Sequence, residues 1–159
     1  MQKLARTIHF DDSDRNVFAR PAESGEWAIP GGFEFSNWSE GDLTGKARQA
    51  FANGWLSVEG FGRATLVAVA QIEAAELEAV TRRLAGHFVT LYGAPDIEAA
   101  LTVAREEIAY MQDLCADHDP NVLLVVQREL TEAGVKESFR AITPAEAELE
   151  IVAVHGELE

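Results

Sequence analysis

The sequence predicts an α+β domain: a mostly antiparallel sheet, with an αα-hairpin and one further helix packed on one face. Three observations predict this class. Two apolar runs, 63–72 and 121–126, are typical of buried strands. Between them, segments 74–91 and 97–115 carry apolar residues at helical spacing. No single short crossover joins the two apolar runs, which favours antiparallel pairing.

The first third of the chain is rich in aromatic residues and predicts short strands. Segments 7–10 and 16–19 are the first two, separated by a turn of Asp and Ser residues. Segment 26–29 leads into a Pro-Gly-Gly turn, and alternation resumes over 33–35. We therefore expect hairpins in this part of the chain.

Three helices are predicted. Ser39 and Asp42 have the spacing of a capping box, and a helix over 40–53 follows. The helices over 74–91 and 97–115 are separated by a connection of a few residues that contains Gly93. Such a short connection predicts antiparallel packing as an αα-hairpin.

The last part of the chain returns to strand patterns. Residues 135–142 alternate imperfectly between the two faces of a strand, after a turn at 131–134. Thr143 and Pro144 could begin one helical turn, and residues 150–155 are interpreted as a last strand. Neither a linker nor a repeat divides the 159 residues, so we expect a single domain over 1–159.

The charge balance and the single cysteine limit the function classes. With 13 basic and 27 acidic residues, a net charge of −14 disfavours binding to nucleic acid and to anionic membranes. Cys115 alone cannot form an intramolecular disulfide or a multi-cysteine zinc site. No apolar stretch reaches the length of a membrane span, and no apolar signal segment follows the N-terminus. We expect a cytoplasmic protein without a cofactor.

A cluster of His9, Asp11, Asp12 and Asp14 is the strongest candidate for chemistry. An imidazole near carboxylates can act in proton transfer or hold a metal ion. A solvated acidic turn explains the same residues without any function. The cluster is therefore a candidate site, and whether the protein is an enzyme stays open.

Part of this cluster also follows a calcium-loop template. Asp12, Asp14, Asn16 and Glu23 occupy the first, third, fifth and twelfth positions of such a loop. The sixth position requires glycine for a sharp turn, and here it is Val17. The sequence therefore predicts an acidic turn and no metal site.

The aromatic residues of the first third suggest a contact surface. Trp and Phe are enriched in interfaces and in ligand pockets, although they also fill cores. The candidate interaction surface consists of Trp27, Phe33, Phe35 and Trp38.

Residues 4–14 (LARTIHFDDSD) and 43–51 (LTGKARQAF) resemble a family of small uncharacterised proteobacterial proteins. The similarity extends over nearly the whole chain. The resemblance implies no assigned activity, catalytic residue or cofactor, and at most an accessory role.

Three hypotheses remain open at this point. The first is a non-catalytic accessory module that binds a protein partner or itself. The second is a small metal-dependent or acid/base enzyme that uses the His9, Asp11, Asp12 and Asp14 cluster. The third is a small-molecule-binding domain with a pocket between the αα-hairpin and the sheet.

Overall fold

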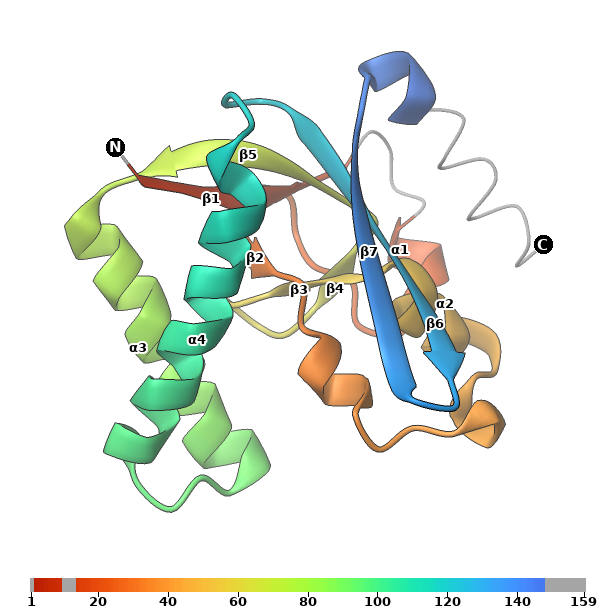
Figure 1. Cartoon of the computed structure of the whole chain (residues 1–159), viewed down its shortest axis with the longest axis horizontal. Coiled ribbons are helices and arrows are strands. Elements are labelled where there is room, and N and C mark those ends of the chain that lie inside the picture. Colours follow the sequence, from red (N-terminus) through yellow and green to blue (C-terminus); the bar gives the residue numbers. More distant parts are fainter. Residues whose placement is uncertain (1, 10–13, 148–159) are drawn as a thin grey trace.

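The computed structural model describes residues 2–9 and 14–147, and its centre is a seven-stranded antiparallel sheet in the order β4-β3-β2-β1-β5-β6-β7 (Figure 1). The strands are β1 (Gln2–Ile8), β2 (Trp27–Ile29), β3 (Trp55–Ser57), β4 (Arg63–Ala64), β5 (Leu66–Ile72), β6 (Leu123–Thr131) and β7 (Gly134–Ile142). Two long helices pack on one face of this sheet. The predicted α+β class and the antiparallel pairing are confirmed.

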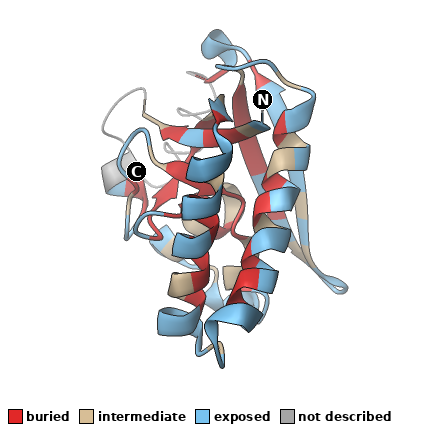
Figure 2. Cartoon of the chain, turned by 90° about the vertical axis from the view of Figure 1, so that its left-hand side faces the viewer, coloured by how far each residue is buried: buried red, intermediate tan, exposed pale blue. Residues whose placement is uncertain are grey.

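The αα-hairpin consists of α3 (Ala74–Tyr92) and α4 (Ile97–Ala116). Gly93 ends α3 in the left-handed conformation, with φ 69°, and Asp96 caps α4 by accepting a hydrogen bond from the Ala99 amide at 2.8 Å. Figure 2 shows buried residues along the inner sides of both helices and exposed residues along their outer sides. The predicted helical hairpin is confirmed: apart from Leu91 and Ile97 at its turn, the apolar stripes of the two helices pack in the large core.

The first third of the chain is more helical than its sequence predicts. It holds α1 (Asp14–Val17), two 3₁₀ turns, η1 (Gly32–Phe35) and η2 (Glu40–Asp42), and then α2 (Gly45–Asn53). The predicted strand over 16–19 is wrong, because α1 runs into that segment. The predicted strand over 33–35 is also wrong. Gly31 takes the left-handed conformation, with φ 70°, and turns the chain directly into η1.

The capping box predicted at Ser39 and Asp42 is present, but it begins a short turn and not the long helix. The Asp42 carboxylate accepts a hydrogen bond from the Ser39 amide at 2.8 Å. Leu43 then leaves the helical conformation, with ψ 68°, and α2 starts at Gly45. The predicted helix over 40–53 is therefore divided into η2 and α2.

Alternation along β6 gives the sheet two apolar faces. Leu124 and Val126 belong to the large core under α3 and α4. Leu123 and Val125 point to the opposite face, where they pack with Ala147. Ala147 closes a helical turn over 144–147, as predicted after Thr143. The last predicted strand, 150–155, lies outside the described residues.

The strand β6 extends beyond its neighbour β5, which leaves room for α2. Strand β5 pairs with β6 at Val67↔Leu124 and Ala68↔Leu123, whereas β6 pairs with β7 along its whole length. In the space beside β6, the Asn53 side chain of α2 donates a hydrogen bond to the Val126 carbonyl at 3.3 Å. This arrangement brings α2, η1 and β4 together at one end of the sheet. None of the helices in the described part of the chain has the apolar length needed to cross a bilayer.

Candidate functional site

Two buried arginines, Arg63 of β4 and Arg128 of β6, hold this end of the molecule together. Both guanidinium groups lie over the ring of Phe35, with Cζ at 4.5 Å and 5.2 Å from its centroid. Both also donate hydrogen bonds to the carbonyls of Pro30 and Gly54. The two arginines therefore fix η1 and the end of α2 relative to the sheet.

Each arginine has its own carboxylate. Arg63 pairs with Glu34 at 2.6 Å, and Arg128 pairs with Glu137 at 2.7 Å. Burial, followed by the neighbouring charge of Arg128, lowers the pKa of Arg63 to about 10. Burial also lowers the pKa of Arg128. Arg63 still carries its proton at neutral pH, so it acts as a fixed positive charge.

A strained residue, Phe61, contributes to the same region. Its φ of 57° is unusual for a bulky side chain, and such conformations cluster at functional sites. Next to it, Gly62 packs directly against the backbone of Pro21 and Ala22, where a Cβ would lie 2.7 Å from the Ala22 nitrogen. Segment 20–22 can therefore lie against β4, through the hydrogen bond between the Arg63 amide and the Arg20 carbonyl.

Between these elements lies a pocket of about 340 Å³. It combines aromatic rings with basic groups, and we call it the aromatic–basic pocket. Three described segments supply its walls: residues 18–20, η1 together with Trp38, and the first half of α2. Phe61 and Arg63 complete the pocket. Its lining consists of Phe18, Ala19, Arg20, Glu34, Phe35, Trp38, Lys46, Ala47, Ala50, Phe61 and Arg63.

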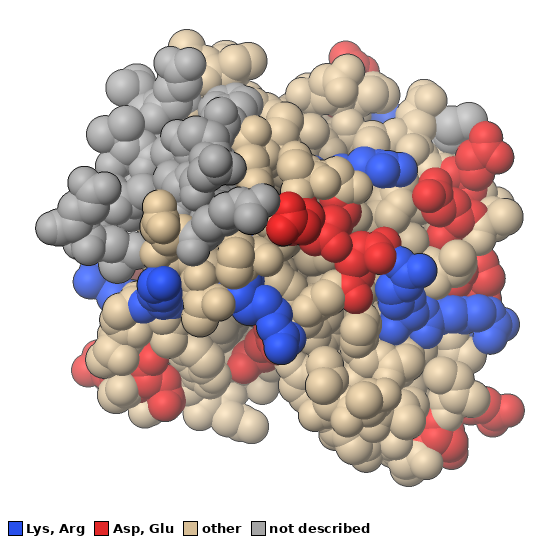
Figure 3. All heavy atoms as spheres, turned by 180° about the vertical axis from the view of Figure 1, so that it is seen from behind, with Lys and Arg blue, Asp and Glu red and all other residues tan. Residues whose placement is uncertain are grey.

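The charge of this lining is opposite to that of the chain. Arg20, Lys46 and Arg63 face a single acid, Glu34, in a protein whose net charge is −14. On the face in Figure 3, Lys and Arg side chains lie in separate groups with Asp and Glu between them. A local excess of cations concentrates small anions.

The described lining is suited to binding more than to covalent chemistry. It contains neither His, Cys, Ser nor Thr. Its carboxylate, Glu34, is already engaged by Arg63 on one oxygen and by the Tyr92 hydroxyl on the other. The remaining groups can attract a negative charge and stack against a ring.

Tyr92 links the end of α3 to this site, and it makes a pH prediction possible. Burial, and then the hydrogen bond to Glu34, raises the pKa of Tyr92, and burial raises the pKa of Tyr110. These are the two tyrosines of the chain. The native state thus keeps protons that the unfolded state releases near pH 10. The free energy of unfolding should therefore fall as the pH rises above about 10.

Absorbance at 295 nm should show tyrosinate forming at higher pH in native protein than in urea. Coinciding titrations would contradict this result.

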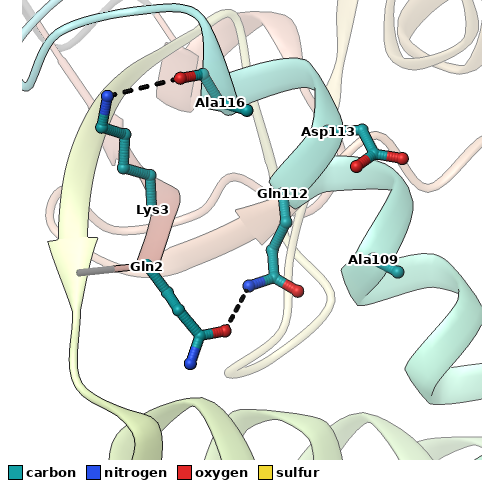
Figure 4. A pocket seen from close by; sticks show the side chains of 6 residues that line it. All are labelled: Gln2, Lys3, Ala109, Gln112, Asp113 and Ala116. Carbon is teal, nitrogen blue, oxygen red and sulfur yellow. Dashed lines mark hydrogen bonds between the residues drawn. The ribbon is translucent and has the colours of Figure 1, made fainter.

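A second pocket, of about 430 Å³, lies between β1 and the end of α4 (Figure 4). There Lys3 donates hydrogen bonds to the carbonyls of Ala116 and His118, and Gln112 donates to Gln2 at 2.7 Å. Its charged lining residues are Lys3 and Asp113, and Lys3 is used by the end of the helix. This pocket therefore has neither a free positive charge nor an aromatic wall among its described residues.

Comparison with protein families finds a match over the whole chain. The matching model, for residues 1–159, is described as a family of unknown function (DUF6505). The chain belongs to this family. No curated protein and no solved structure matches the chain. Membership of DUF6505 confirms the resemblance to an uncharacterised family. It assigns no activity to the chain.

Within this member of DUF6505, the predicted His9 cluster is only partly described. His9 lies just after β1 and is half-buried, and Asp14 begins α1. Asp11 and Asp12 lie outside the described residues, so the cluster stays a prediction. Among the described residues, no group of three or more His, Cys, Asp or Glu side chains is placed to hold a metal ion.

The four aromatic residues of the predicted contact surface are divided between three places. Trp27 is buried in β2, where Arg6 lies over its ring and its Nε1 donates to Glu76 at 3.3 Å. Phe33 packs against Phe88 and Tyr92 of α3. Phe35 is buried, Trp38 is half-buried, and both line the aromatic–basic pocket. These rings do not form one exposed patch.

The sequence reasoning missed the two buried arginines and the basic lining. One signal was available for Arg128. It continues the alternation of Leu124 and Val126, so a strand extended past 126 would have placed it on the core side. Cys115, in contrast, is buried as expected, and burial raises the pKa of its thiol to about 12.

Proposed function

We propose that the protein is a non-catalytic binding protein for a small organic anion, held in the aromatic–basic pocket. The observation that carries this proposal is the lining: three cations and one engaged acid beside four aromatic residues, in a strongly acidic chain. The volume of about 340 Å³ falls within the range of small-molecule sites.

Two of the cations are available to a ligand. Lys46 is exposed on the first turn of α2. Its side chain forms neither a hydrogen bond nor an ion pair with any of the described residues. Arg20 is exposed and makes one long hydrogen bond, 3.4 Å, to the Gly60 carbonyl. Arg63 lies deeper and adds positive charge behind them. Because the chain repels anions at long range, this local group of cations has to supply the attraction.

A matched pair of variants on α2 tests the proposal. Lys46→Glu and Arg48→Glu make the same change of charge, on exposed residues two positions apart, but Arg48 does not line the pocket. Thermal unfolding is followed at constant ionic strength with benzoate, phenyl phosphate, acetate, inorganic phosphate and neutral analogues.

Anions should raise Tm, because a ligand at a hundred times its Kd stabilises the native state by about 2.7 kcal/mol. Lys46→Glu should abolish this increase, and Arg48→Glu should keep it. Equal responses of the two variants, or no anion-specific increase in the native protein, would overturn the proposal.

A second candidate continues the hypothesis of an accessory module with a protein partner. Leu91, Tyr92 and Ile97, at the turn between α3 and α4, are 54%, 47% and 47% exposed. An exposed apolar group of this kind favours contact with another protein. In this form the protein would be a cytoplasmic accessory protein of bacteria, and it would associate with itself or a partner. A Leu91→Ser, Ile97→Ser double variant that leaves light scattering and pull-down unchanged would remove this candidate.

A further inference from the structure

We infer that the ligand of the aromatic–basic pocket is an aryl anion, with its planar ring at Trp38 and its carboxylate or phosphate at Lys46. This inference rests on the proposed function and adds the ring. The inference is based on the lining, in which Trp38 and Lys46 belong to different walls of the same pocket.

Trp38 provides a platform for a ring. Its indole is stacked with Phe51, with 15° between the planes and 6.4 Å between the centroids, and it forms a T-shaped pair with Phe35 at 4.8 Å and 85°. These contacts fix the orientation of the indole, yet Trp38 is only half-buried, and it lines the pocket. A fixed and partly open aromatic face stacks favourably on a planar ligand.

Helix α2 supplies the wall that carries the charge. Lys46 lies in the first turn of α2, and Ala50 lies one turn further along the same side. The small side chains of Ala47 and Ala50 leave space for a ring beside the helix.

The size of the pocket agrees with such a ligand. At about 340 Å³ it lies at the low end of the range for small-molecule sites. A single ring with one acidic group fits within this space, whereas a dinucleotide exceeds it. The Phe35 ring beneath Arg63 also leaves the floor of the pocket both apolar and positively charged.

Tryptophan fluorescence tests the inference directly. The chain has three tryptophans, of which Trp27 is 4% exposed and Trp55 is fully buried. A change in fluorescence on binding therefore reports Trp38. The probes are phenyl phosphate and phenylacetate, with inorganic phosphate and acetate as anions without a ring, and benzyl alcohol as a ring without charge.

We expect the aryl anions to quench the fluorescence and to bind at least tenfold more tightly than the matching simple anions and benzyl alcohol. Preference for one of the two aryl anions identifies the acidic group as phosphate or carboxylate. In Trp38→Leu, followed by the Tm increase, this tenfold advantage should disappear while binding of the simple anions persists.

The failures of the two proposals are distinguishable. If inorganic phosphate or acetate binds as tightly as its aryl analogue, the aryl inference is overturned and the anion-binding function stands. If none of the anions binds, both are overturned. If Trp38→Leu folds with native circular dichroism and keeps the tenfold advantage, the ring does not lie at Trp38 and the inference is overturned.

Discussion

Replacement of Arg128 by alanine should lower the free energy of unfolding by about 3–5 kcal/mol, the usual result of breaking a buried ion pair. The Arg128 side chain is fully buried and pairs with Glu137 at 2.7 Å. It also donates to three main-chain carbonyls, those of Pro30, Phe51 and Gly54. Without it, the Phe51 carbonyl and the Glu137 carboxylate lose this donor, and the carbonyls of Pro30 and Gly54 keep only Arg63.

The measurement is urea unfolding followed by circular dichroism, with Arg105→Ala as the control. Arg105 also contacts a glutamate, Glu78 at 3.8 Å, but its side chain is 57% exposed. Its loss should cost less than about 1 kcal/mol. Arg128→Lys should fall between the two, because a lysine keeps the charge but not the planar set of five donors. Equal small losses for Arg128→Ala and Arg105→Ala would contradict the role of the buried arginine.

The second large effect is expected at Gly31. Its left-handed conformation turns the chain into η1, and a Cβ there would overlap the side chain of the buried Leu56. Gly31→Ala should therefore combine a backbone cost of about 1–2 kcal/mol with an overpacking cost of about 1–3 kcal/mol. The carbonyls of Pro30 and Gly31, which accept hydrogen bonds from Arg63, would be displaced with it.

Gly25→Ala provides the control for this effect. Gly25 also has a positive φ, 87°, but nothing lies within 4 Å of its Cβ position. It should show the backbone cost alone, in the same urea experiment. If Gly31→Ala is no more destabilising than Gly25→Ala, the close contact with Leu56 does not shape the Pro30–Gly32 turn.

The long elements were predictable because their signals are local. The apolar stripe of 74–91 continues for several turns and ends at Gly93, and α3 ends at Tyr92 as a result. The single strand predicted over 63–72 is divided in the structure: residues 66–72 form β5 inside the sheet, as expected, but residues 63–64 form β4 at its edge. The long apolar run predicts the buried strand and not the break at Thr65.

The short segments were harder, because neighbouring residues do not decide their conformation. Residues 33–35 alternate like a strand, yet Gly31 and the buried position of Phe35 under two guanidinium groups produce a 3₁₀ turn. Of the predicted contact residues, Phe35 and Trp38 do belong to the candidate site, although as pocket lining. The sequence could not place the pocket, since Arg20, Lys46 and Arg63 converge only through the tertiary fold.

The most direct test of anion binding is a titration of the native protein with phenyl phosphate, followed by backbone amide chemical shifts. We predict saturable shifts that gather at residues 18–20, 34–38, 46–50 and 61–63, around the aromatic–basic pocket. Saturable shifts at Gln2, Lys3 and Gln112 instead, or no saturable shift at all, would contradict the account.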